Sequence, residues 1–188
     1  MLRDRIMLRL IVALTGALAI ASLPKLAAAE DAQPDPVSVM KRLFEARNSA
    51  NPDAAAALFA VNAEVVNAVG ARLAGMEAIR RFMAGGIAQK GRYEVQDIRY
   101  EGGVVRWSDL VTNDVYRKLE IAPVEVVGEA VVDQGRIKSF ITHFPPSSME
   151  KFERACKVAK ADGILIVGLT CPQFLRNANA QMRNATAR

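Results

Sequence analysis

Histidine and cysteine are scarce in this chain, and their scarcity excludes several kinds of site. The 188 residues include one histidine, His143, and two cysteines without Cys-x-x-Cys spacing. These residues do not make up the ligand set of a structural zinc site, so we expect no metal. The sequence also lacks a glycine-rich phosphate loop and the Ser, His and Asp order of a hydrolase triad. We therefore expect no nucleotide or other cofactor.

Basic clusters interleaved with aromatic residues are absent too. The whole chain has a formal net charge of +5. Much of this surplus belongs to the first 29 residues, where four basic side chains stand against Asp4 and give +3. The rest of the chain is therefore near +2. So small a surplus does not predict binding to nucleic acid.

The first 29 residues have the features of a secretory signal peptide. Three arginines among the first nine residues precede an apolar run over residues 11–21, and small residues lead up to Ala29. This order is typical of a cleaved export signal. The apolar run is shorter than the roughly 20 residues that a membrane span needs. We therefore expect a periplasmic or secreted protein that begins near Glu30 and has no membrane association after cleavage; an uncleaved anchor is the alternative.

The two cysteines, Cys156 and Cys171, both lie near the end of the chain. Two cysteines in an oxidising compartment can pair, and Gly163 between them lets the chain reverse. We predict a disulfide between them. Closing a loop of this length stabilises a fold by about 3 kcal/mol in the chain-entropy model. It would hold the apolar residues 164–169 against the domain.

Helix signals come first along the mature chain, and strand signals follow. Asp35-Pro36 and Asn51-Pro52 are typical helix starts. They predict helices over residues 36 to about 48 and 54–60. A third helix contains Ile79, Phe82 and Met83, and Gly85-Gly86 is expected to end it. Strands are predicted over residues 93 to about 102, 104–119, 124–132 and 136–144, the last two joined by a hairpin.

Helices followed by an antiparallel sheet predict an α+β fold, with the helices on one face. We divide the chain into a signal peptide (residues 1–29), a linker (30–36), a single domain (37–146), and a C-terminal helix and tail (147–188). Residues 147–160 have helical spacing. The residues after Gln173 are polar, and we expect them to fray.

Short segments of the domain carry a resemblance to a known family. They are residues 57–60 (Ala-Leu-Phe-Ala), 63–66 (Ala-Glu-Val-Val), 75–82 (Gly-Met-Glu-Ala-Ile-Arg-Arg-Phe) and the hairpin at 135–140. Together they resemble the nuclear-transport-factor-2-like superfamily, which includes ketosteroid isomerases, SnoaL-type polyketide cyclases and limonene-type epoxide hydrolases. The resemblance covers residues 37–145. It implies N-terminal helices packed on a curved antiparallel sheet that forms a cone-shaped pocket, with a C-terminal helical extension.

The resemblance also allows the catalytic positions of those enzymes to be compared with this chain. Asn67 stands where the ketosteroid isomerases have their general base, and Leu43 stands in place of their oxyanion tyrosine. An amide cannot take a proton at neutral pH, and leucine has no donor. The positions of the limonene-type hydrolase residues hold Asp109, Val111 and Thr142. Of these three, only Asp109 could help to position and activate water, and it has the wrong charge for the position it occupies.

Other candidates follow from strand alternation. Trp107 and Asp109 are two residues apart on a predicted strand, so they share a face. Such a pair suits a ligand with an apolar body and a polar head; the alternative is a core tryptophan beside a solvated carboxylate. Asn67 either lines the pocket or caps a turn. His143 is out of phase with Phe140, Thr142 and Phe144. The predicted ligand-binding residues are Phe44, Asn67, Trp107, Asp109 and Thr142.

The leading hypothesis is an exported domain that binds a small hydrophobic molecule and has no demonstrable catalytic set. The first alternative is an enzyme of the isomerase, polyketide-cyclase or epoxide-hydrolase type that uses Asp109 with Asn67 or Trp107. The second is a partner-binding module that forms a homodimer through its open sheet face.

Overall fold

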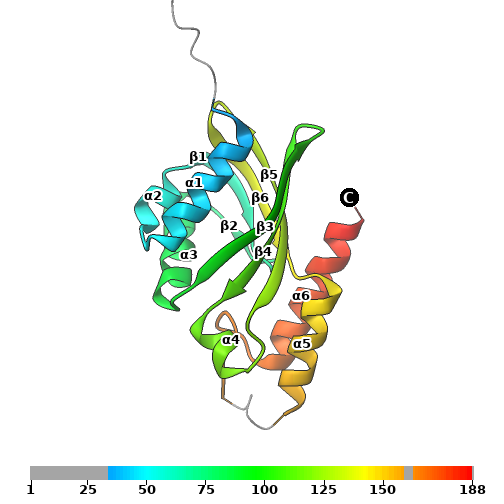
Figure 1. Cartoon of the computed structure of the whole chain (residues 1–188). Helices are drawn as coiled ribbons and strands as arrows, with labels where there is room; N and C mark the ends of the chain where they lie inside the picture. The colour runs from blue at the N-terminus through cyan, green and yellow to red at the C-terminus, as the bar shows by residue number, and fades with distance from the viewer. Residues whose placement is uncertain (1–33, 159–162, 188) are drawn as a thin grey trace, which may run out of the picture. The chain divides into compact units, whose positions relative to one another are not determined.

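The computed structural model describes residues 34–158 and 163–187 (Figure 1). The predicted signal peptide and most of the predicted linker lie outside these residues. Within the described parts of the chain, none of the helices combines the length and the apolar character that crossing a membrane requires.

The first two helices begin at the predicted signals. Helix α1 spans Pro36–Asn48, and the Asp35 side chain caps it by accepting a hydrogen bond from the Ser38 amide at 3.0 Å. Helix α2 spans only Pro52–Ala56, which is shorter than predicted. Phe59 begins a strand instead, because its backbone pairs with β6 and its ring packs 5.7 Å from that of Phe140. Sheet pairing therefore overrides the local helical pattern.

Helix α3 spans Met76–Ala88 and contains Gly85 and Gly86, which were predicted to end it. A Cβ atom at Gly86 would lie 2.5 Å from the hydroxyl oxygen of Tyr93. The glycine thus makes room for the Tyr93 side chain against the helix, and it does not act as a stop signal.

Six strands form a curved, unclosed sheet in the order β2-β1-β6-β5-β4-β3. Their bounds are β1 Phe59–Val66, β2 Arg72–Leu73, β3 Arg92–Glu101, β4 Val104–Thr112, β5 Val124–Asp133 and β6 Arg136–His143. The sheet was predicted to be antiparallel, but β1 and β6 pair in parallel. The chain passes from β1 through β2 and α3 and enters the far edge of the sheet at β3. Three reversals then bring β6 back beside β1 in the same direction.

Strand β4 is shorter than the predicted strand over residues 104–119. It ends at Thr112, and helix α4 spans Asp114–Lys118. The side chain of Asn113 caps α4 by accepting a hydrogen bond from the Tyr116 amide at 2.8 Å. This local cap outweighs the β-forming tendency of the segment. The resulting helix places the Tyr116 side chain in the interior.

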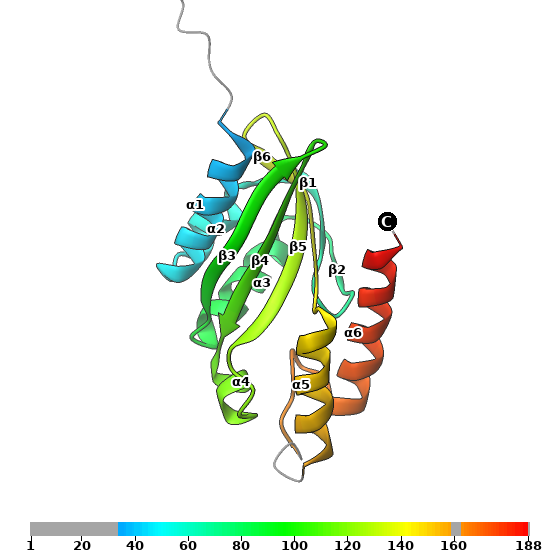
Figure 2. The same ribbon diagram turned by 45° about the vertical axis from the view of Figure 1, so that its right-hand side comes forward.

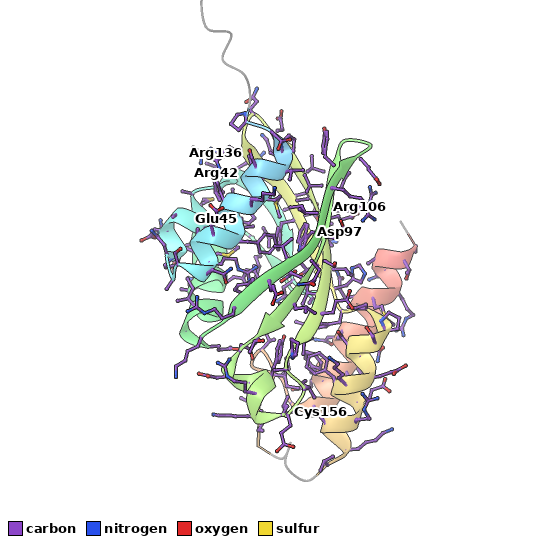
Figure 3. All side chains as sticks on the ribbon, viewed as in Figure 1. Arg42, Glu45, Asp97, Arg106, Arg136 and Cys156 are labelled. Carbon is purple, nitrogen blue, oxygen red and sulfur yellow. A yellow bond between two sulfur atoms is a disulfide. The ribbon has the colours of Figure 1, made fainter. Side chains whose placement is uncertain are left out.

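The C-terminal region is a pair of helices, α5 (Pro146–Lys157) and α6 (Cys171–Thr186). The prediction that the residues after Gln173 fray is wrong. Helix α6 starts with a capping box between Thr170 and Gln173, and it buries Phe174 and Ala178 completely. The predicted disulfide between Cys156 and Cys171 is confirmed, with the two Cα atoms 5.6 Å apart. Figure 3 shows Cys156 near the end of α5.

Helices α1, α2 and α3 lie together on one side of the sheet (Figure 1). Helices α5 and α6 lie side by side on the side away from them (Figure 2). The core between the first three helices and the sheet encloses the cavity described next.

Candidate functional site

A cavity of about 290 Å³ lies between helices α1, α3 and α4 and the sheet. Much of its wall is apolar. Polar side chains are a minority of the lining residues and come from several elements. Among the residues that line it are Arg47, Asn67, Phe82, Gln89, Tyr93, Trp107, Asp109, Val111, Asn113, Tyr116, Val126, Phe140, Thr142, Phe144 and Val167.

The structure brings most of the predicted ligand-binding residues to this cavity. Asn67, Trp107, Asp109 and Thr142 all lie in its wall. Phe44 is not among the described lining residues. Its ring packs edge-on against Trp107, with the ring centroids 5.9 Å apart, and so supports the wall from behind. A ligand-binding role for these residues stays a prediction.

Trp107 and Asp109 share the cavity face of β4, as strand alternation predicts. The indole Nε1 of Trp107 donates a hydrogen bond to Asp109 Oδ1 at 3.0 Å, and both side chains are buried. Gly128 lies directly opposite Trp107 on β5. A Cβ atom there would come within 2.3 Å of Trp107 Cζ2, so only glycine lets the indole ring lie across the neighbouring strand.

Burial changes the acidity of Asp109. The side chain is only 2% exposed, and desolvation raises the pKa of its carboxyl from 3.8 to about 6, while the Arg47 charge and the Trp107 hydrogen bond act in the opposite direction. A carboxyl with such a pKa gains or loses its proton near neutral pH. Asp109 is therefore suited to proton transfer as well as to binding.

Arg47 forms a second polar feature of the cavity. Its guanidinium carbon lies 3.6 Å from the centre of the Tyr93 ring. Asn48 fixes this stack, because its side chain bonds both the amide and the carbonyl of Tyr93, at 2.9 and 2.8 Å. The Arg47 Nε atom is buried and has no hydrogen-bond partner among the described residues.

Tyr116 is carried to the cavity by the short helix α4. Burial raises the pKa of its hydroxyl well above the ordinary value, and the nearby Tyr93 and Asp109 raise it further. The hydroxyl therefore stays protonated and available as a hydrogen-bond donor. Its ring packs edge-on against Phe152 of α5, with centroids 5.5 Å apart, which joins the cavity wall to the C-terminal helices.

Both interpretations of Asn67 hold at once. Its Oδ1 accepts hydrogen bonds from the amides of Val69 and Ala71, at 3.1 and 2.9 Å, and so caps the turn between β1 and β2. The same residue also lines the cavity. His143, in contrast, faces a hollow on the other side of the sheet, as its phase predicts. Burial lowers the pKa of its imidazole.

Val167 reaches the cavity from the segment between α5 and α6. It has a φ of 54°, and its neighbours Ile166 and Leu169 exchange backbone hydrogen bonds of 2.9 and 3.0 Å. A β-branched residue in this region is strained. The side chain is 46% exposed and belongs to the cavity wall, so the C-terminal region also shapes the site.

Sequence reasoning missed Arg47, Tyr93, Tyr116 and Val167. Arg47 had a usable signal: it follows Leu43 by four residues and therefore shares the buried face of α1. Tyr93 and Tyr116 carried no pattern that separates a cavity wall from a core. The described residues contain no group of three His, Cys, Asp or Glu side chains arranged to hold a metal ion.

Comparison with known proteins identifies the family. The SnoaL-like domain family matches residues 40–140, so the chain belongs to this family, within the nuclear-transport-factor-2-like fold that the sequence resembles. No curated protein matches the chain.

Solved structures share the fold. A putative polyketide cyclase from Sinorhizobium meliloti is 23% identical, covers 56% of this chain and 94% of its own, and has a TM-score of 0.50. A protein from Kribbella flavida is 17% identical over 68% of this chain and 97% of its own, with a TM-score of 0.54. An NTF2-like protein of unknown function from Mesorhizobium loti is 20% identical over 57% and 88%, with a TM-score of 0.50. At these identities the similarity concerns the fold alone.

Proposed function

We propose that this protein is an exported domain of the SnoaL-like type that binds a small hydrophobic molecule carrying one polar group. The observation that supports this most is the cavity of about 290 Å³, with its largely apolar wall and a few polar side chains. Ligand sites commonly measure about 300–1,000 Å³ and have this composition. The volume is near the lower limit, so the ligand is small.

The polar side chains also fit a binding role. Burying a polar or charged group is costly unless the group is paired. Asp109 and Tyr116 are buried in the wall, and the Nε atom of Arg47 has no partner in the described part of the chain. A ligand that bonds to these groups would offset part of this cost and take one orientation.

A neutral fluorescent probe tests the proposal. N-phenyl-1-naphthylamine should bind the purified protein and be displaced by small apolar molecules. Trp107→Ala should weaken its binding, because the indole forms part of the wall. Tyr100→Ala, which changes a half-exposed aromatic residue outside the cavity lining, should leave binding unchanged. Absence of displaceable binding to the unmodified protein would contradict the proposal.

A second candidate function is acid–base catalysis, and the buried Asp109 carboxyl with a pKa of about 6 favours it. Asp109 would take a proton from the carbon beside a substrate carbonyl and later return it to another carbon. The Tyr116 hydroxyl would donate a hydrogen bond to the oxyanion formed in between. This is the proton transfer of an isomerase.

Steroid isomerisation is not expected. Leu43 lies in the core and offers no donor, and the Asn67 Oδ1 is engaged by two backbone amides. We expect no detectable isomerisation of a Δ5-3-ketosteroid by the unmodified protein, and none after Asn67→Asp. Efficient isomerisation by the unmodified protein would instead support Asp109 as the base. Asp109→Asn would then abolish it.

The partner-binding alternative requires a flat apolar sheet face. The face turned away from α1–α3 carries Asp97 and Arg106, which point away from these helices in Figure 3. Arg99, Glu129 and His143 line the same hollow as these two residues. This charged surface favours the small-molecule proposal over a homodimer formed through the sheet.

Export has its own test. If residues 1–29 are cleaved, N-terminal sequencing of the secreted protein should begin at Glu30 or close to it. Membrane-bound protein that keeps Met1 would contradict the export part of the proposal.

A further inference from the structure

We propose that Arg47 binds a carboxylate on the ligand, so that the cavity selects small carboxylic acids over neutral molecules of the same shape. This inference rests on the proposed binding function and adds a ligand class to it. It concerns a residue that stands in the last turn of α1, where a cation also suits the helix dipole.

The Arg47 guanidinium has no ion-paired partner among the described residues, although it interacts electrostatically with Asp109. None of the ion pairs between described residues includes Arg47. The charge of Arg47 lowers the pKa of Asp109, yet the two side chains do not form an ion pair. A cavity that contains a cation without a bonded partner is suited to an anionic ligand group.

The Nε edge of the Arg47 guanidinium has no partner among the described residues. The guanidinium carbon lies over the Tyr93 ring, 3.6 Å from its centre. The Nε atom is buried and has no hydrogen-bond partner among the described residues. A carboxylate binds such a planar group through two parallel hydrogen bonds. The buried Nε–H is part of the side edge that such an arrangement uses.

The stack of Arg47 on Tyr93 is held in place by neighbouring residues. Asn48, the next residue on α1, bonds both backbone groups of Tyr93. Gly86 of α3 leaves room for the Tyr93 hydroxyl, and a Cβ atom there would also lie 3.8 Å from Arg47 Nη2. An arginine fixed in this way loses less conformational entropy when it binds an anion than an exposed arginine does.

Calorimetric titration with a matched pair of probes tests the inference. Octanoate and octanamide have the same chain and differ in charge. We expect octanoate to bind the unmodified protein about tenfold or more tightly, since hydrogen bonds to charged groups are about twice as strong as neutral ones. Arg47→Gln should remove this difference and leave octanamide binding within about twofold. Arg47→Lys should keep part of it, because lysine retains the charge and loses the planar edge.

Arg42→Gln is the matched control, since Arg42 is an exposed arginine on the same helix (Figure 3). It should leave both affinities unchanged. Circular dichroism confirms that each variant is folded. If Arg47→Gln does not fold, the comparison of the two probes on the unmodified protein and the Arg47→Lys variant still decides.

The same titration is repeated at several pH values. The charged or titratable groups around Asp109 are Arg47 from α1 and Tyr116 from α4, with Tyr93 of β3 beside them. Asp109, with a pKa of about 6, changes charge near this pH. Its carboxylate repels a bound anion, so octanoate affinity should fall as the pH rises above about 6. Octanamide affinity should not change, and Asp109→Asn should remove the dependence for octanoate.

The possible outcomes distinguish a failure of the carboxylate inference from a failure of the proposed binding function. If octanamide binds and octanoate binds no more tightly, the carboxylate inference is overturned and the small-molecule site stands. The same holds if Arg47→Gln weakens both probes equally, which would make Arg47 a wall residue only. If neither probe binds, and N-phenyl-1-naphthylamine does not bind either, both proposals fail.

Discussion

The cavity and the aromatic cluster beside it share the rings of Tyr116 and Phe144, but the rest of their side chains differ in chemistry. The aromatic cluster consists of Tyr116, Phe144, Phe152 and Phe174, whose ring centroids lie 4.5 to 5.6 Å apart in successive contacts. Two of its rings come from the C-terminal helices α5 and α6, and all but Tyr116 lie outside the family match at residues 40–140. The cavity instead contains the buried carboxyl of Asp109, which burial makes costly, and the part-buried Arg47, whose Nε atom is buried. Stability should therefore be concentrated in the cluster, and ligand binding and pH response in the cavity.

The largest effect should come from breaking the cluster. Phe174 is fully buried between Phe144 and Phe152, and removing a buried phenylalanine side chain costs about 3–5 kcal/mol. Phe174→Ala should lower the free energy of unfolding by this amount in a urea titration. Leu165→Ala, at a side chain that is 54% exposed, should change it little. Equal effects of the two substitutions would mean that α6 is not part of the core.

The disulfide is the next contribution to the C-terminal region. The double variant Cys156→Ser with Cys171→Ser should lose about 3 kcal/mol of unfolding free energy. Because Val167 lies on the segment that this bond closes, the variant should also bind the neutral probe less tightly. A loss of stability without any change in binding would show that the C-terminal segment does not shape the cavity.

The pH dependence of stability should show that the Asp109 carboxyl is buried in the cavity. The folded state raises the pKa of Asp109 from 3.8 to about 6. The folded protein therefore holds this proton more tightly, and stability should fall as the pH rises from about 4 to about 6. The fall amounts to about 3 kcal/mol relative to Asp109→Asn. Urea titrations of both proteins across this range measure the difference. A difference that does not vary with pH would contradict the raised pKa.

Two neighbouring glycines of α3, Gly85 and Gly86, should have smaller and opposite effects on stability when replaced by alanine. Gly86→Ala should cost about 1–3 kcal/mol, because the new methyl group would clash with the Tyr93 hydroxyl. At Gly85 a Cβ atom meets nothing within 4 Å, so Gly85→Ala should stabilise the helix by about 0.5–1 kcal/mol. Thermal melts of the two variants should therefore move in opposite directions. Shifts of the same sign would contradict the account of Tyr93.

Much of this fold follows from local signals in the sequence. The cap at Asp35, the hairpin before Arg136 and the shared face of Trp107 and Asp109 are all confirmed. Each of them depends on residues that are close in sequence. The family resemblance and the disulfide were also predictable, since the first rests on packing segments and the second on two cysteines.

The features that were missed depend on distant contacts. The parallel pairing of β1 with β6 follows from the path of the whole sheet. Helix α6 is polar on most of its surface, and it is held by Phe174, by the disulfide and by a hydrogen bond from Gln181 to the Thr142 carbonyl at 3.2 Å. Arg47, Tyr93, Asp109 and Tyr116 of the cavity come from α1, β3, β4 and α4, and no local pattern predicts that these elements meet.

Native mass spectrometry of the protein purified from its native cells tests the small-molecule site most directly. We expect the folded chain to carry the additional mass of a small molecule, to release it on denaturation, and to lose it in the Trp107→Ala variant. Protein that shows only the mass of the bare chain, and that takes up neither octanoate nor N-phenyl-1-naphthylamine when these are added, would contradict the account.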